Sequence, residues 1–97
     1  MTADNSSTTI RRRVVYTGRV QGVCFRATTQ DLSRGFKVVG HVCNLRDGTV
    51  ELEAEGSSEQ VGAFLDVISR QFQHNLQHTQ TDEMPVRGDE SNFEIQY

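Results

Sequence analysis

The strongest constraint on the fold is a strictly alternating segment in the middle of the chain. From Thr49 to Glu55, three apolar residues alternate with three glutamates: Val50, Leu52 and Ala54 against Glu51, Glu53 and Glu55. Successive side chains of a β-strand point to opposite faces of the sheet, so the pattern predicts a strand with one buried face and one acidic, solvated face. Such a sheet needs a second layer to cover its apolar side.

Hydrophobic periodicity divides the rest of the chain into further strands and two amphipathic helices. The second helix begins with a capping box, in which Ser57 is followed three residues later by Gln60. The resulting β-α-β-β-α-β order predicts an α+β sandwich of ferredoxin-like topology, with an antiparallel sheet and both helices on one face. We expect strands at 13–18, 38–44, 49–55 and (with a weaker pattern) 79–84, helices at 25–36 and from 57 to about 75, and a short final strand containing Phe93, Ile95 and Tyr97.

Length and composition narrow the class of protein. The 97 residues fit one domain, with residues 1–10 predicted as a disordered polar tail and residues 11–97 as the folded domain. A net charge of −3 argues against broad nucleic-acid binding, and no apolar run is long enough to span a membrane. The two cysteines, Cys24 and Cys43, form no CxxC pair and are expected to be reduced thiols in the cytoplasm.

The run from Gly18 to Arg26 lies between the first strand and the first helix. Its sequence is Gly-Arg-Val-Gln-Gly-Val-Cys-Phe-Arg, without an acidic residue. The first turn of a helix leaves backbone N–H groups unpaired, and a guanidinium beside it is suited to phosphate or carboxylate. The run therefore favours a small-anion site, most simply for phosphate, although Gly18 and Gly22 could also just shape the turn. It matches neither a Walker P-loop nor a dinucleotide loop.

Asn44 ends the second predicted strand, just before a turn at Arg46-Asp47-Gly48. Such a residue is usually a strand-end residue. We expect its strand to lie beside the first strand, where the amide could reach the bound anion and hold a water molecule.

These two segments resemble the signatures of the acylphosphatase family. The first motif is the run from Gly18 to Arg26, and the second is Gly-His-Val-Cys-Asn-Leu-Arg-Asp-Gly-Thr-Val-Glu at 40–51. The C-terminal Asn-Phe-Glu-Ile at 92–95 is also similar to the family's ending.

The resemblance implies a metal-independent enzyme that hydrolyses the carboxyl–phosphate bond of acyl phosphates, without a cofactor and as a monomer. It assigns Arg26 to phosphate binding, Asn44 to orienting the attacking water, and Thr49 to supporting that asparagine. The phosphate cradle is assigned to the backbone amides of the loop, at Val20, Gln21, Gly22, Val23, Cys24, Phe25 and Arg26. Phosphoryl transfer asks mainly for charge stabilisation and an in-line nucleophile, which these groups supply. We infer that a phosphate oxygen of the substrate takes the proton.

Three positions depart from the family pattern. His41 stands where an aromatic residue is usual, Cys43 where a basic or polar residue is usual, and Lys37 where glycine is common. By strand alternation, His41 and Cys43 are expected to point away from Asn44 and to affect packing.

Other candidate residues favour structural roles. His74 and His78 have helical i, i+4 spacing but no third metal ligand nearby, so a solvated helix end is expected. Cys24 lacks the Cys-x₅-Arg spacing of a phosphocysteine enzyme. The rival functions are a non-catalytic anion- or ligand-binding module on the same fold and an RNA-binding domain, and the glutamate face of 51–55 argues against the latter.

Overall fold

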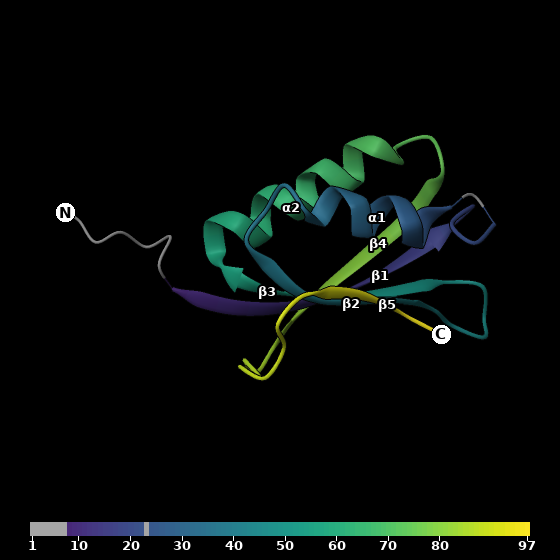
Figure 1. Ribbon diagram of the computed structural model, residues 1–97. Helices are drawn as coiled ribbons and strands as arrows, with labels where there is room; N and C mark the ends of the chain where they lie inside the picture. Colours follow the sequence, from purple (N-terminus) through teal and green to yellow (C-terminus); the bar gives the residue numbers. More distant parts are fainter. Residues whose placement is uncertain (1–7, 23) are drawn as a thin grey trace.

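The computed structural model describes residues 8–22 and 24–97, and shows a five-stranded sheet with two helices packed on one face (Figure 1). The predicted β-α-β-β-α-β order and the short final strand are confirmed. In chain order the elements are β1 (Thr9–Gly18), α1 (Phe25–Ser33), β2 (Val38–Asn44), β3 (Val50–Ser57), α2 (Ser58–Gln71), β4 (Leu76–Met84) and β5 (Phe93–Gln96).

The strands are arranged in the order β4-β1-β3-β2-β5. All neighbours are antiparallel except β2 and β5, which run parallel. The prediction that the strand ending at Asn44 lies beside the first strand is wrong, because β3 lies between β1 and β2. The helix that connects β1 to β2 carries the chain past one strand position, and β3 then pairs with both.

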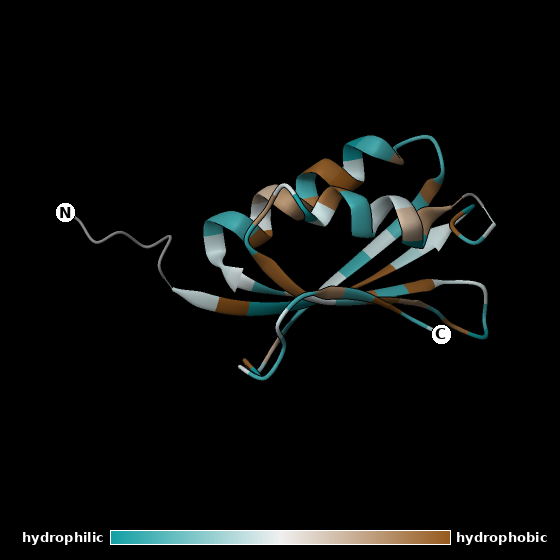
Figure 2. Cartoon of the chain, in the orientation of Figure 1, coloured by the Kyte–Doolittle hydropathy of each residue, from teal (hydrophilic) through white to brown (hydrophobic). Residues whose placement is uncertain are grey.

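The hydrophobic core lies between the helices and the sheet. On β3, Leu52 and Ala54 are fully buried, and on α2 Phe64 and Ile68 are fully buried as well. Phe64 packs edge-on against Phe93 of β5, with the ring centroids 5.3 Å apart. Hydrophobic and hydrophilic segments alternate along both layers, as expected of amphipathic elements that bury one side each (Figure 2).

Several element boundaries differ from the predictions. Thr9 and Ile10 were predicted to lie in a disordered tail. They belong to β1, because they pair with Ser57 and Gly56 of β3. Residues 1–7 of that tail lie outside the described residues. The first helix ends at Ser33 rather than Phe36, before Gly35, although Phe36 still packs against the core. The second helix ends at Gln71, three residues before His74.

The acidic face of β3 is not the solvated surface that the alternation predicts. Glu55 is only 5% exposed and lies beside Arg11, which is 1% exposed. Arg11 forms ion pairs with Glu53, Glu55 and Glu90, at 2.6, 3.0 and 2.6 Å. The segment after β4 covers this face, because the backbone N–H groups of residues 87 and 88 donate to the Glu55 carboxylate. No helix in the described part of the chain is long and apolar enough to cross a bilayer.

Candidate active site

A cavity of about 260 Å³ opens at one end of the sandwich. In Figure 1 the loop before α1, the β2–β3 hairpin and the C-terminus meet at this same end. The cavity is lined by Val20, Gly22, Cys24, Phe25, Arg26, Ala27, Asn44, Ile95 and Tyr97. The structure therefore brings together Arg26, Asn44 and four of the other predicted loop residues. Arg26 and Asn44 are 18 positions apart in the sequence.

The loop enters α1 through two left-handed backbone conformations. Gly22 has φ 82° and Cys24, the N-cap residue of α1, has φ 60°. Cys24 makes no side-chain capping bond, and the first turn of α1 contains no acidic residue. The N–H groups of that turn have no intrahelical acceptors, so this helix start offers hydrogen-bond donors and the positive end of the dipole to the cavity.

The loop is anchored at both ends. At its start, Arg19 N–H donates to the Asn75 carbonyl at 2.8 Å. Gly18 has φ 137°, and a Cβ at this position would collide with the same carbonyl, so the close approach requires glycine. At its end, Phe25 is 2% exposed and stacks against Phe72, with centroids 4.3 Å apart.

Arg26 is the cation of the cavity. Its guanidinium carbon lies 4.9 Å from the centroid of the Tyr97 ring, a cation–π contact. Among the described residues no carboxylate forms an ion pair with Arg26, whereas Arg11 and Arg13 each form an ion pair with a glutamate. The charge of Arg26 is therefore available to an anion in the cavity.

Asn44 is the last residue of β2 and pairs with Val50 just before the hairpin turn. It is exposed and lines the cavity. The parallel register between β2 and β5 aligns Cys43 with Gln96, so Asn44 and Tyr97 each follow the last aligned pair and reach the same edge.

Two predicted residues lie beside the cavity rather than in its lining. Gln21 donates from Nε2 to the carbonyls of Leu45 and Thr49, both at 2.9 Å. The Thr49 hydroxyl donates to Asp47 Oδ1 at 2.6 Å, and its own N–H donates to the same oxygen at 3.0 Å. Thr49 thus stabilises the hairpin that carries Asn44. The predicted cradle residue Val23 lies outside the described residues.

Ala27, Ile95 and Tyr97 line the cavity and were missed by sequence reasoning. Ala27 follows the arginine on α1 and carries no chemistry that could mark it. Ile95 and Tyr97 reach the site only because β5 pairs with β2. This contact joins segments that are distant in the sequence, and no local sequence pattern predicts it.

The other candidates of the sequence lie elsewhere. His74 follows the end of α2 and His78 lies on β4, so the two do not share a helical face. His41 and Cys43 point to the outer face of the sheet, away from the cavity, and contact Glu51. Burial, together with the charge of Glu51, raises the pKa of the Cys43 thiol.

Comparison with known proteins identifies the family of this chain. The family model described as acylphosphatase matches residues 12–95, which include the loop, Arg26 and Asn44. The chain belongs to the acylphosphatase family. An acylphosphatase of Bifidobacterium longum is 40% identical over 82 residues, with 84% of each chain covered. An acylphosphatase of Geobacillus thermodenitrificans is 39% identical over 88 residues, covering 90% of this chain and 94% of the relative.

The fold agrees with a solved acylphosphatase structure. The crystal structure of acylphosphatase from Bacillus subtilis superposes with a TM-score of 0.80 at 28% identity, covering 91% of this chain and 99% of that one. The family model ends at residue 95, two residues before Tyr97. The contact between Tyr97 and Arg26 therefore involves one residue that the family model does not match.

Proposed function

We propose that the cavity is the site where this member of the acylphosphatase family hydrolyses acyl phosphates to a carboxylate and inorganic phosphate. Arg26 and the backbone amides of the loop bind the phosphoryl group, and Asn44 orients the attacking water. The observation that carries this proposal is that one cavity, at the N-terminus of a helix, is lined by both Arg26 and Asn44, whose side chains have no ion-pair or hydrogen-bond partner among the described residues.

Phosphate binding is supported by the charge of the cavity wall. The described lining residues include Arg26 and contain no acidic or histidine side chain. A dianionic phosphoryl group would meet a planar guanidinium and the positive end of α1, with no acidic side chain among these residues to repel it. The ring of Tyr97 lies against the guanidinium in a cation–π contact.

Hydrolysis is supported by the position of Asn44. Its side chain makes no hydrogen bond to another described residue, so the amide oxygen can accept from a water molecule. The carboxylate of an acyl phosphate is a good leaving group, and phosphoryl transfer depends mainly on positioning and charge stabilisation. Because the described lining residues offer no acidic or histidine side chain as base, a phosphate oxygen of the substrate takes the proton of the attacking water.

The proposal also covers the oligomeric state of the enzyme, its compartment and its independence of metals and cofactors. The catalytic domain begins with β1 at Thr9, acts as a monomer in the cytoplasm and requires no metal or cofactor for hydrolysis. Two cysteines that form no disulfide support a reducing compartment. Among the described residues only Val86 and Tyr97 are large exposed hydrophobic side chains, which supports a monomer because stable interfaces need extended apolar patches.

The test is hydrolysis of an aromatic acyl phosphate such as benzoyl phosphate, in the presence of a metal chelator. We expect rapid turnover by the wild type and about 10²–10³-fold lower turnover in Asn44→Ala and Arg26→Ala. Arg19→Ala is the matched control, because Arg19 is an exposed arginine of the same loop outside the cavity lining. Equal loss in Arg19→Ala, or no turnover in a folded wild type that still binds phosphate, would contradict the proposal and favour a binding module.

A further inference from the structure

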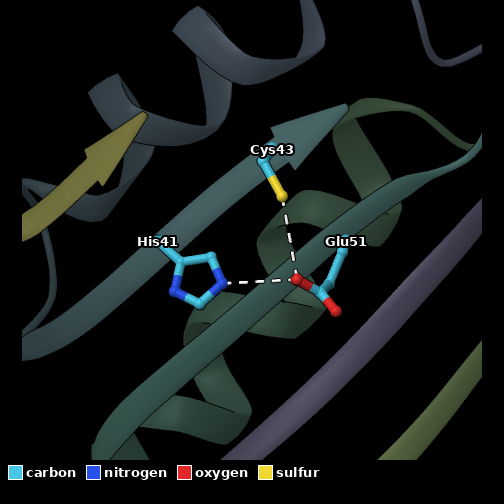
Figure 3. Close-up of side chains that lie close together, drawn as sticks. All are labelled: His41, Cys43 and Glu51. Carbon is cyan, nitrogen blue, oxygen red and sulfur yellow. Dashed lines mark hydrogen bonds and ion pairs between the residues drawn. The ribbon is translucent and has the colours of Figure 1, made fainter. Parts of the chain in front are cut away.

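A second group of chemically active side chains lies on the outer face of the sheet, opposite the helices. His41 and Cys43 of β2 and Glu51 of β3 form this outer-face cluster (Figure 3). The antiparallel register aligns Cys43 with Glu51, and His41 lies two residues away on the same face. Their potential ligand atoms all lie within 4.8 Å of one another.

Two distances inside the outer-face cluster match those between ligands of a tetrahedral zinc ion, and the third, between His41 and Cys43, is within 4.8 Å. His41 Nε2 lies 3.4 Å from Glu51 Oε1, and Cys43 Sγ lies 3.7 Å from the same oxygen. With zinc–nitrogen and zinc–oxygen bonds of about 2.0–2.1 Å and zinc–sulfur bonds of about 2.3 Å, tetrahedral geometry places neighbouring ligand atoms about 3.3–3.7 Å apart. Two of the ligand–ligand distances that a tetrahedral zinc site requires are therefore present without the metal.

Neighbouring residues hold the ligands in orientations suitable for a metal. Arg13 Nε donates to Glu51 Oε2 at 2.7 Å, which leaves Oε1 as the oxygen facing His41 and Cys43. His41 is 7% exposed, and its buried Nδ1 has no hydrogen-bond partner within residues 8–22 and 24–97. Glu90 Oε2 lies 4.0 Å from that nitrogen. A metal on Nε2 would fix the proton on Nδ1, facing the Glu90 carboxylate, as in the carboxylate–histidine–zinc arrangement.

We propose that the outer-face cluster binds Zn²⁺ through His41 Nε2, Cys43 Sγ and Glu51 Oε1, with water in the fourth position. One imidazole, one thiolate and one carboxylate form a donor set suited to borderline divalent ions such as Zn²⁺ and Co²⁺, and not to Mg²⁺ or Ca²⁺. Cys43 binds as the thiolate, and its proton passes to solvent. The site is separate from hydrolysis, because Asn44 points to the opposite face of β2 and lines the cavity.

Cobalt provides the most direct test, since a thiolate ligand gives Co²⁺ a charge-transfer band in the near ultraviolet. The full chain, reduced and metal-free, is titrated with Co²⁺ and then with Zn²⁺. We expect a charge-transfer band that saturates at one Co²⁺ per chain and disappears as Zn²⁺ displaces it. Cys43→Ser should abolish the band, and His41→Phe, which keeps a ring in the buried position, should weaken Co²⁺ binding by more than about tenfold.

The second cysteine supplies the matched control. Cys24→Ser removes the exposed thiol of the loop and should leave the band and the Co²⁺ affinity unchanged. In that variant Cys43 is the only thiol, so protection of Cys43 from alkylation by added Zn²⁺ tests the site without altering any proposed ligand. Absence of the band in the folded wild type, a band that persists in Cys43→Ser, or an alkylation rate unaffected by Zn²⁺ would overturn the proposal.

Discussion

Gln21 Nε2 donates a hydrogen bond to the Thr49 carbonyl at 2.9 Å, and the same nitrogen also reaches the carbonyl of Leu45 at 2.9 Å. This one side chain joins the loop before α1 to the hairpin that carries Asn44. Such a bridge is needed because β3 separates β1 from β2, so the two halves of the site are not on neighbouring strands. Gln21 thereby links the loop that we propose binds phosphate to the hairpin that carries the proposed water-orienting amide.

Replacing Gln21 by alanine should therefore loosen the site without unfolding the protein. Gln21→Ala loses two hydrogen bonds, each with a net contribution of about 0.5–1.5 kcal/mol, and we expect about a tenfold fall in kcat/KM. Steady-state hydrolysis of benzoyl phosphate measures this, with Gln80→Ala as the control, since Gln80 is exposed on β4 and its side chain donates to Asp82, away from the loop. Equal activity in both variants would show that the bridge does not position the loop.

The ring of Tyr97 should matter more for substrate binding than for turnover. An exposed cation–π contact contributes about 0.5–1 kcal/mol, so losing the restraint on Arg26 in Tyr97→Ala should raise KM about threefold. Tyr97→Phe retains an aromatic face over the guanidinium and should resemble the wild type. A fall in kcat at unchanged KM in Tyr97→Ala would contradict this role.

Arg11 should be the most stability-sensitive charged residue of the sheet. It is 1% exposed and forms ion pairs with three glutamates. Removing one partner of a buried ionic network leaves uncompensated charge, so Arg11→Ala should lose about 3–5 kcal/mol of unfolding free energy in urea denaturation. Arg12→Ala is the control, because Arg12 is partly exposed and its pair with Glu83 is 3.8 Å long; we expect a change within about 0.5 kcal/mol. Similar losses in the two variants would refute the network's importance.

Glu55 should contribute to the loss of stability in acid. Burial alone would raise the pKa of this carboxyl, but hydrogen bonds from the Arg87 and Gly88 backbone and from Arg11 outweigh it and lower the pKa below the ordinary value of 4.5. A carboxyl with a lowered folded pKa stabilises the fold above the unfolded pKa, and this stabilisation is lost as pH falls through the folded value.

The measurement is the unfolding free energy of wild type and Glu55→Gln between neutral pH and about pH 3. We expect the variant to be less stable at neutral pH and its stability to fall less steeply below about pH 4.5. Glu83→Gln, at an exposed position, should retain the wild-type slope. Parallel acid profiles of wild type and Glu55→Gln would argue against the assignment.

Local patterns predicted most of the architecture. The alternation on β3 identified Val50, Leu52 and Ala54 as buried, and all three are fully buried. The predicted N-cap is confirmed, since Ser57 Oγ accepts from Gln60 N–H at 3.1 Å. The Gln60 side chain, however, accepts from Lys37 N–H instead of closing the capping box. These successes depend on interactions within a few residues, which a sequence displays directly.

Contacts between distant segments could not be predicted in the same way. The glutamates of β3 have the same alternation whether water or protein covers them, and only the segment after β4 decides that Glu55 is buried. Likewise, Tyr97 reaches Arg26 because β5 pairs in parallel with β2. Arg26 and Asn44 were proposed without such knowledge, because the segments that contain them resemble the acylphosphatase signatures, although an asparagine before a turn is by itself an ordinary strand-end residue.

In the proposed mechanism Arg26 binds the phosphoryl group while Asn44 acts on water, and one experiment separates these two roles. The measurement is kcat for benzoyl phosphate together with inhibition by inorganic phosphate, in wild type, Asn44→Ala and Arg26→Ala. We predict that Asn44→Ala loses about 10²–10³-fold in kcat with phosphate inhibition nearly unchanged, and that Arg26→Ala loses both. Asn44→Ala turning over at the wild-type rate, or losing phosphate affinity as fully as Arg26→Ala, would contradict the account.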